Sequence, residues 1–195
     1  SAEAQAHSRR AERNEPRLIT YDRFGHRVDQ VELDPSWHWL LDGAIERGIH
    51  ALPWADPRPG AHVARTALEF LWTHANAGVM CPISMTYSAV PALRVDPDLA
   101  AEWEPRLIAG ALCGMAMTEK QGGSDVRTNT TRAEPLGDGW YELHGHKWFC
   151  SYPPCDIFLV LAQAPGGLSC FLLERGPGME FQRLKDKLGT RSLPS

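Results

Sequence analysis

The chain has 195 residues, of which 43% are hydrophobic, 23% charged and 9% aromatic, with a formal net charge of −4. This composition is that of an ordinary globular protein, so it excludes disordered and collagen-like chains and allows one domain or two small ones. The acidic balance gives no electrostatic reason to expect nucleic acid on this segment, because phosphate binding needs concentrated Lys and Arg.

The cysteines and the hydropathy of the chain indicate in which compartment the protein is expected. The five cysteines are odd in number, widely spread and free of any CxxC pair, so neither a disulfide framework nor a structural zinc site is indicated. No stretch approaches the roughly 18 to 20 consecutive apolar residues that span a bilayer, and the N-terminus lacks the apolar run of a signal peptide. We therefore expect reduced thiols, a cytoplasmic location and no membrane insertion.

Residues 1–33 carry many charges and show no clear periodicity beyond a β-like patch at 18–21, so they are left unassigned. Helical signals begin at Asp34-Pro35, where Asp offers an N-cap acceptor and Pro suits the first helical turn. Apolar residues then recur at helical spacing, which predicts a helix to about Gly48. Similar patterns predict helices over residues 60–78, 84–93 and 96–107, the last one shortened or kinked by a proline at position 105.

The periodicity changes after Gly110. Gly-rich and Pro-rich turns separate short β-like segments, which span residues 111–117, 140–150, 157–164, 168–174 and 180–184. Short strands at this spacing predict an antiparallel sheet or barrel. Helices followed by strands predict an α+β fold rather than an alternating βα order. We therefore divide the chain into a mainly helical domain, residues 1–110, and a β-domain, residues 111–195.

The most informative stretch runs from Met115 to Asp125 and reads Met-Ala-Met-Thr-Glu-Lys-Gln-Gly-Gly-Ser-Asp. Its adjacent glycines permit close backbone approach, and consecutive NH groups with the hydroxyls of Thr118 and Ser124 could hold a phosphate or a polar ring edge. A Gly-Gly loop between strands is more often a plain turn, so the residues permit ligand binding without requiring it. The stretch is neither a P-loop nor the dinucleotide-binding GxGxxG.

This stretch closely resembles the first signature of the acyl-CoA dehydrogenase family, in which an apolar strand leads into Thr-Glu and then into Gly-Ser-Asp. The resemblance implies an FAD site, with Thr118 offering a hydroxyl to the flavin ring. Ser124 would lie by the pyrophosphate and could also reach the acyl-CoA substrate. The cofactor-binding residues implied in this stretch are Met115, Ala116, Met117, Thr118, Gly122, Gly123 and Ser124.

Two further elements follow in the order that the family shows. The segment Lys147-Trp148-Phe149-Cys150-Ser151 resembles one in which most members have Trp and Thr where Phe149 and Ser151 stand. By resemblance, Phe149 would be the aromatic wall against the flavin and Ser151 its hydroxyl partner. Cys150 belongs to the implied cofactor site as a strand residue, not a redox partner. The turn from Lys187 to Ser192 resembles the Lys-x-Gly-x-Arg turn late in the family's β-domain.

Several strings are similar to one branch of the family, the AidB type, which is linked to the adaptive response to alkylation damage. They include Asn129 to Glu134, Gly145 to Phe149 and Gly166 to Phe171. Lys120 and Thr128 depart from the commoner family pattern, in which many members have Pro and a small residue. Phe149 and Ser151 keep the aromatic face and the hydroxyl of the family's Trp and Thr, so we expect these two replacements to affect substrate preference and flavin tuning more than FAD binding.

The resemblance implies FAD-dependent α,β-dehydrogenation of an acyl-CoA thioester, with hydride transfer to flavin N5. Partners would be the acyl-CoA substrate and an acceptor such as electron-transfer flavoprotein, and the complete protein would be a homo-oligomer. The base would be a glutamate in a C-terminal helical bundle after Ser195, so no catalytic residue is nominated; Glu119 is expected to form structural hydrogen bonds. The chain is expected to be incomplete at both ends, to lack that bundle, and to be inactive alone.

Two other interpretations stay open. The first is a flavin-containing, DNA-associated protein of the alkylation response with weak or vestigial dehydrogenase activity, in which DNA binding would belong to the region after Ser195. The second is a metal site on His144 and His146, which would share one face of a strand. No third ligand is visible in the sequence, so no metal is predicted.

Overall fold

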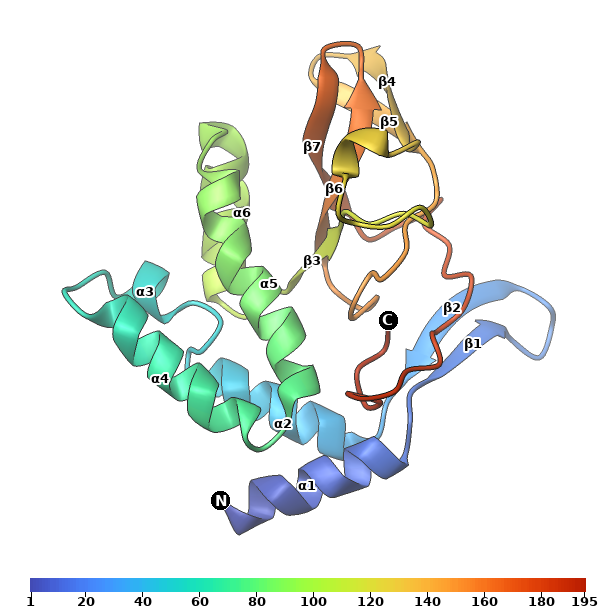
Figure 1. The fold of residues 1–195 in the computed structure, drawn as a ribbon. Helices are drawn as coiled ribbons and strands as arrows, with labels where there is room; N and C mark the ends of the chain where they lie inside the picture. The colour runs from blue at the N-terminus through green and yellow to red at the C-terminus, as the bar shows by residue number, and fades with distance from the viewer.

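A helix and a hairpin occupy the N-terminal region that the sequence pattern left unassigned (Figure 1). The computed structural model describes residues 1–195 and places α1 at Ala2–Arg13, followed by the antiparallel strands β1 (Arg17–Tyr21) and β2 (Arg27–Glu32). Ser1 caps α1 by accepting a hydrogen bond from the backbone NH of Ala4 at 3.2 Å. The apolar pattern of the sequence did not reveal α1, because only two alanines of this charge-rich helix are buried.

The predicted helices are present, with changed boundaries. The structure has α2 at Pro35–Glu46, a short α3 at Leu52–Ala55, α4 at Ala61–Thr73, α5 at Ala77–Leu93 and α6 at Pro97–Ile108. Asp34 and Asp96 cap α2 and α6 as predicted. The predicted shortening at Pro105 is wrong, because α6 continues to Ile108. Pro105 removes one hydrogen bond to the carbonyl of Ala101, and Ala101 is exposed, so water can satisfy that carbonyl.

The second half of the chain forms a five-stranded sheet. Its strands are β3 (Cys113–Ala116), β4 (Arg132–Gly137), β5 (Trp140–His144), β6 (Ile157–Ala164) and β7 (Gly167–Glu174), with the 3₁₀ helix η1 at Val126–Thr128. The α+β fold is confirmed, but the sheet is mixed rather than wholly antiparallel. β3 and β4 pair with β6 in parallel, whereas β4 pairs with β5 and β6 with β7 in antiparallel register.

Two strand predictions need correction. The strand expected over residues 140–150 ends at His144, and residues 180–184 form no strand. The 180–184 segment is instead held by the β1–β2 hairpin. The guanidinium of Arg27 donates to the Phe181 carbonyl at 3.2 Å, and the Phe181 NH donates to the Asp29 carboxylate at 2.9 Å. These side chains satisfy backbone groups that a strand would have paired, and no sequence period reveals them.

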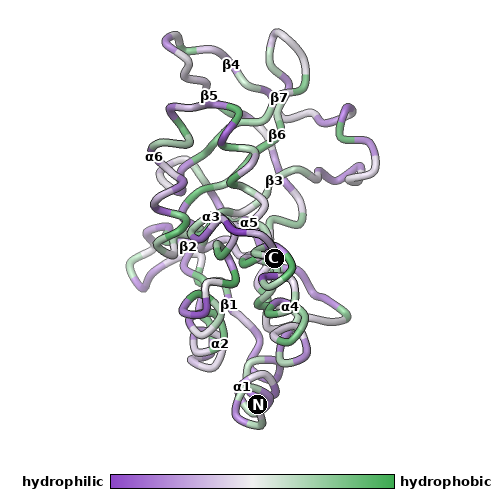
Figure 2. Tube along the Cα trace, turned by 90° about the vertical axis from the view of Figure 1, so that its left-hand side faces the viewer, coloured by the Kyte–Doolittle hydropathy of each residue, from purple (hydrophilic) through white to green (hydrophobic).

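Two buried hydrophobic clusters join the helices to the sheet. The larger buried cluster combines Trp37 and Leu40 of α2 and Ile83 of α5 with Phe158 of β6, and a smaller cluster packs α5 and α6 on β3 and β6. Thr86 links the two layers, since its buried hydroxyl donates to the Pro82 carbonyl and accepts from the Cys113 NH at 3.0 Å. Figure 2 shows hydrophobic stretches along β6 and in the helical layer. β3 is therefore held both by its pairing with β6 and by the hydrogen bond to Thr86 of α5.

Gly114 of β3 is required by the packing of the neighbouring strand. A Cβ atom at this position would lie 2.5 Å from two carbons of the Phe158 ring, and Phe158 is fully buried. We expect Gly114→Ala to lower the free energy of unfolding by about 1 to 3 kcal/mol through overpacking. Urea unfolding of the complete protein would measure the loss. Gly166→Ala is the control, since a Cβ there meets nothing within 4 Å, and equal stability of both variants would contradict the prediction.

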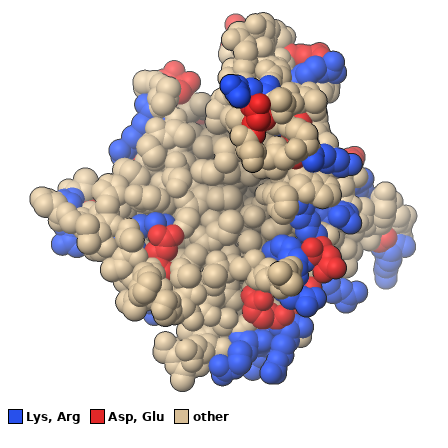
Figure 3. All heavy atoms as spheres, in the orientation of Figure 1, with Lys and Arg blue, Asp and Glu red and all other residues tan.

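An apolar face of α4 lies in the solvent. Val63, Phe70 and Leu71 are 74%, 62% and 66% exposed, although residues of this type pack inside most globular proteins. The face of the molecule drawn in Figure 3 has a broad central area without Lys, Arg, Asp or Glu, while Lys and Arg gather toward its lower right. None of the helices combines the length and apolar character needed to cross a bilayer.

Candidate functional site

The first two motif segments meet where β3 ends. The backbone NH of Trp148 donates to the carbonyl of Thr118 at 2.8 Å, and the ammonium group of Lys147 lies 2.8 Å from the carboxylate of Glu119. Thirty residues apart in sequence, the two segments are thus joined by a backbone hydrogen bond and by a buried ion pair. The resemblance implied that both would face one cofactor, and the fold brings them together.

Glu119 is the polar centre of this junction. Its carboxylate accepts hydrogen bonds from the NH and hydroxyl groups of both Thr130 and Thr131, at 2.6 to 3.0 Å, in addition to the contact with Lys147. Burial alone would raise the pKa of Glu119, which is 3% exposed. The hydrogen bonds from Lys147, Thr131 and Thr130 outweigh burial and hold that pKa far below its usual value. Glu119 is therefore a permanent carboxylate with a structural role.

Amide side chains hold the glycine-containing loop after β3. Asn129, which is buried, donates to the Met117 carbonyl at 2.8 Å and accepts from the Gln121 amide at 3.0 Å. Gln163 of β6 donates to the carbonyls of Arg127 and Asn129 at 3.0 and 3.1 Å. The roles of Asn129 and Gln163 had no signal in the sequence, because the carbonyls they satisfy belong to an irregular loop.

The two adjacent glycines of the loop differ in the space beside them. Gly122 has a φ of +117°, a conformation that L side chains rarely adopt, and a Cβ there would meet nothing within 4 Å. At Gly123 a Cβ would lie 2.8 Å from the Thr118 hydroxyl oxygen. Ser124 is exposed, and Asp125 caps η1. Close backbone approach is thus possible at Gly122, whereas the Thr118 side chain fills the space beside Gly123.

Aromatic and apolar groups line the other part of the junction. Phe149 has a φ of +64° and is 57% exposed, and Met117 is 42% exposed, whereas Met115 and Thr118 are half-buried and Ala116 is buried. Burial raises the pKa of the Cys150 thiol to about 11, so this thiol is not activated for redox chemistry. The Ser151 hydroxyl lies 3.3 Å from that of Ser195.

The third motif segment lies against α1 rather than against the glycine loop. The Arg191 guanidinium pairs with Glu15 at 2.5 Å, and its NH donates to the Glu12 carboxylate at 2.9 Å. Lys187 donates to the carbonyl of Leu193. This segment therefore packs against the helical part of the chain.

The structure shows no metal site at the two histidines of β5 and the loop after it. His144 pairs with Glu142 at 3.3 Å, and no group of three or more His, Cys, Asp or Glu side chains is placed to hold a metal ion.

Comparison with known proteins assigns the family. Residues 1–112 match the family model described as "Adaptive response protein AidB N-terminal domain", and residues 114–195 match "Acyl-CoA dehydrogenase, middle domain". The chain belongs to the acyl-CoA dehydrogenase family, in its AidB-type branch. The predicted resemblance is thereby confirmed.

Two curated relatives show how much of such a protein this AidB-type chain represents. It is 45% identical over 214 aligned residues to "Putative acyl-CoA dehydrogenase AidB" of Escherichia coli K12, and 34% identical over 224 to "Acyl-CoA dehydrogenase family member 11" of Caenorhabditis elegans. The alignments include 98% and 100% of this chain but 40% and 36% of those proteins. The chain thus spans about two fifths of the relatives' length.

The structural likeness extends over the whole chain. The crystal structure of Caenorhabditis elegans ACDH-11 in complex with C11-CoA matches 99% of this chain and 37% of its own, with a TM-score of 0.91 and 33% identity. The helical layer, the mixed sheet and their connection are therefore arranged as in that protein.

Proposed function

We propose that the complete protein binds FAD and catalyses α,β-dehydrogenation of an acyl-CoA thioester. The observation that carries this proposal is the junction at the end of β3, where the family's first two motif segments share the Trp148–Thr118 hydrogen bond and the Lys147–Glu119 ion pair. Two segments that each resemble a flavin contact are held rigidly side by side. Membership of the acyl-CoA dehydrogenase family supports the same reading.

The residues at the junction fit a flavin. A flat ring needs an aromatic or apolar surface, which the exposed side chains of Phe149 and Met117 offer. A pyrophosphate needs close approach to the backbone, which Gly122 permits, since a Cβ there would meet nothing within 4 Å. FAD would be held by Met115, Ala116, Met117, Thr118, Gly122, Gly123, Ser124, Phe149, Cys150 and Ser151. When bound, it would accept the hydride, while the chain's own residues orient the ring and exclude water from it.

Substrate contacts and the catalytic base divide between this chain and the remainder of the protein. Exposed Ser124 is the residue here that we assign to acyl-CoA binding, and the relative ACDH-11 was crystallised in complex with C11-CoA. We assign the base to the region after Ser195, as the family resemblance implies. Glu119 is not available for this role, because it accepts five hydrogen bonds. The same proposal has three further parts. The chain is divided into residues 1–110 and 111–195, the complete protein forms a homo-oligomer, and electron-transfer flavoprotein is the electron acceptor.

A second candidate function rests on the family model that matches residues 1–112, which is that of an adaptive response protein. In this reading the complete protein is a flavin-containing, DNA-associated protein of the alkylation response, with weak dehydrogenase activity. DNA binding would belong to the region after Ser195, because the net charge of this chain is −4.

The visible absorption spectrum of the complete protein tests both functions. A dehydrogenase should show an oxidised flavin band that bleaches when straight or branched acyl-CoA is added without oxygen. A flavin band that no acyl-CoA bleaches would favour the DNA-associated function. A colourless protein that cannot be reconstituted with FAD would contradict both.

Phe149 gives a site-specific prediction. Phe149→Ala should weaken FAD binding about 2- to 10-fold, which corresponds to the roughly 0.5 to 1.5 kcal/mol of an aromatic pair beyond its buried area. Titration of the apoprotein with FAD, followed by flavin fluorescence, would measure the dissociation constant. Phe24→Ala is the matched control, because Phe24 is also exposed, at 70%, and lies in the β1–β2 turn. If both variants bind FAD with equal affinity, Phe149 does not contact the flavin.

A further inference from the structure

Lys185 has a solvent-shielded ammonium group that no hydrogen-bond acceptor in the chain satisfies. This group lies directly against the ring of Phe149 and 4.2 Å from the ring centre of Trp148. A shielded cation without a hydrogen bond is costly, and cation–π contacts recover only part of that cost. Aromatic rings are therefore the main groups that face this charge.

Positive charge gathers around Trp148 without neutralisation. Lys120 and Arg183 lie 6.0 and 5.5 Å from the Trp148 ring centre, and none of Lys120, Arg183 and Lys185 forms an ion pair with an Asp or Glu. Burial, and then repulsion by Arg183, lowers the pKa of Lys185 to about 8. The pKa shift has the sign expected of a cation that lacks its counter-charge.

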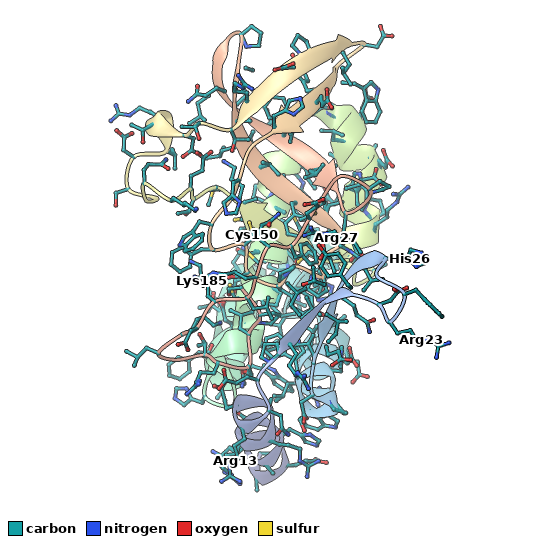
Figure 4. All side chains as sticks on the ribbon, turned by 90° about the vertical axis from the view of Figure 1, so that its right-hand side faces the viewer. Arg13, Arg23, His26, Arg27, Cys150 and Lys185 are labelled. Atoms are coloured by element: carbon teal, nitrogen blue, oxygen red, sulfur yellow. The ribbon has the colours of Figure 1, made fainter.

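The ring of Phe149 stands between this charge and solvent. Lys185 covers one side of Phe149, yet 57% of the side chain remains exposed, so the opposite side is open. Phe149 also has a left-handed backbone conformation, with a φ of +64°, which surrounding contacts must maintain in a residue of this size. Figure 4 shows Lys185 near Cys150, the residue after Phe149, and away from the hairpin that carries Arg23.

We infer that Lys185 is a positioning residue for the flavin: it fixes the Phe149 ring and places a positive charge behind the face on which the flavin stacks. This inference rests on the proposed function and adds a residue from outside the three motif segments. A positive charge at this place stabilises whichever form of the ring ligand carries more negative charge. Lys185 therefore increases affinity for the reduced flavin more than for the oxidised flavin.

Three variants of the complete protein test the role of this charge. Lys185→Met retains the length and apolar contacts of the side chain and removes the charge, and Lys185→Arg retains the charge. Arg23→Met removes a matched cation, since Arg23 lies 4.6 Å above the exposed ring of Phe24 in the hairpin turn. The readouts are the dissociation constant for oxidised FAD and the flavin midpoint potential, both of which are independent of turnover.

Lys185→Met should weaken binding of reduced flavin about tenfold more than that of oxidised flavin, which lowers the two-electron midpoint potential by about 30 mV. Lys185→Arg and Arg23→Met should keep the wild-type potential. A wild-type potential in Lys185→Met would overturn the inference while leaving FAD binding intact. A potential in Lys185→Arg as low as in Lys185→Met would also overturn it, because charge would not be the cause. A wild-type protein that binds no FAD would instead refute the proposed function, and this inference with it.

Discussion

Replacing Lys147 by Met is expected to lower the free energy of unfolding by about 3 kcal/mol, the lower end of the roughly 3 to 5 kcal/mol found when one partner of a buried ion pair is removed. The side chains of Lys147 and Glu119 are only 9% and 3% exposed. Without Lys147, a carboxylate stays buried without a counter-ion. Four hydrogen bonds from Thr130 and Thr131 remain, which is why we expect the lower end.

Urea unfolding of the complete protein would measure this loss, with Lys120→Met as the control. Lys120 follows Glu119 directly in the chain, is exposed and forms no ion pair, so its replacement should change stability by less than about 0.5 kcal/mol. Similar values for the two variants would show that the ion pair contributes nothing. In a double-mutant cycle, adding Glu119→Gln should make Lys147→Met less costly, because the buried charge is gone.

The Lys147–Glu119 pair should make the protein less stable in acid. The folded-state pKa of Glu119 lies far below the value of about 4.3 expected in the unfolded chain. Its stabilising contribution is therefore complete above about pH 4.3 and is lost as the pH falls from there toward the folded-state pKa. As the pH falls below about 4.3, the wild type should lose stability more steeply than Glu119→Gln.

Gly145→Ala is expected to be the second large loss, of about 1 to 3 kcal/mol, through overpacking against Thr131. A Cβ at position 145 would meet the Cβ and Cγ2 of Thr131 at 2.6 Å, and its hydroxyl oxygen closer still. Thr131 is buried and gives two hydrogen bonds to Glu119, at 3.0 and 2.6 Å. The added methyl group must move Thr131 away from the carboxylate or shift the segment that leads to Lys147.

An effect on FAD binding should distinguish Gly145→Ala from a variant that only overpacks the core. Gly145→Ala should weaken FAD binding as well as stability, because the shift reaches both motif segments, whereas Gly114→Ala should affect mainly stability. FAD titration and urea unfolding of both variants would separate the effects. Gly176→Ala, where a Cβ meets nothing within 4 Å, should change neither. Unaltered FAD affinity in Gly145→Ala would mean that the Thr131–Glu119 contacts do not position the ligand site.

The sequence by itself determined where α2 and α6 begin, the order of the two halves and the family. Asp34-Pro35 and Asp96-Pro97 each combine a side-chain cap with a residue suited to the first turn, so local chemistry is sufficient there. The motif from Met115 to Asp125 is equally local. These features depend on neighbours along the chain, and a single sequence displays them completely.

Only the tertiary structure decided the mixed sheet, the irregular course of residues 180–184 and the contacts that make the site. Parallel pairing of β3 with β6 joins residues more than 40 positions apart, and its apolar pattern is that of any buried strand. Glu119 appeared in the motif, but its five donors come from Thr130, Thr131 and Lys147. Lys185 reaches Phe149 from a segment without periodicity. Such pairings arise from long-range packing, which local spacing does not encode.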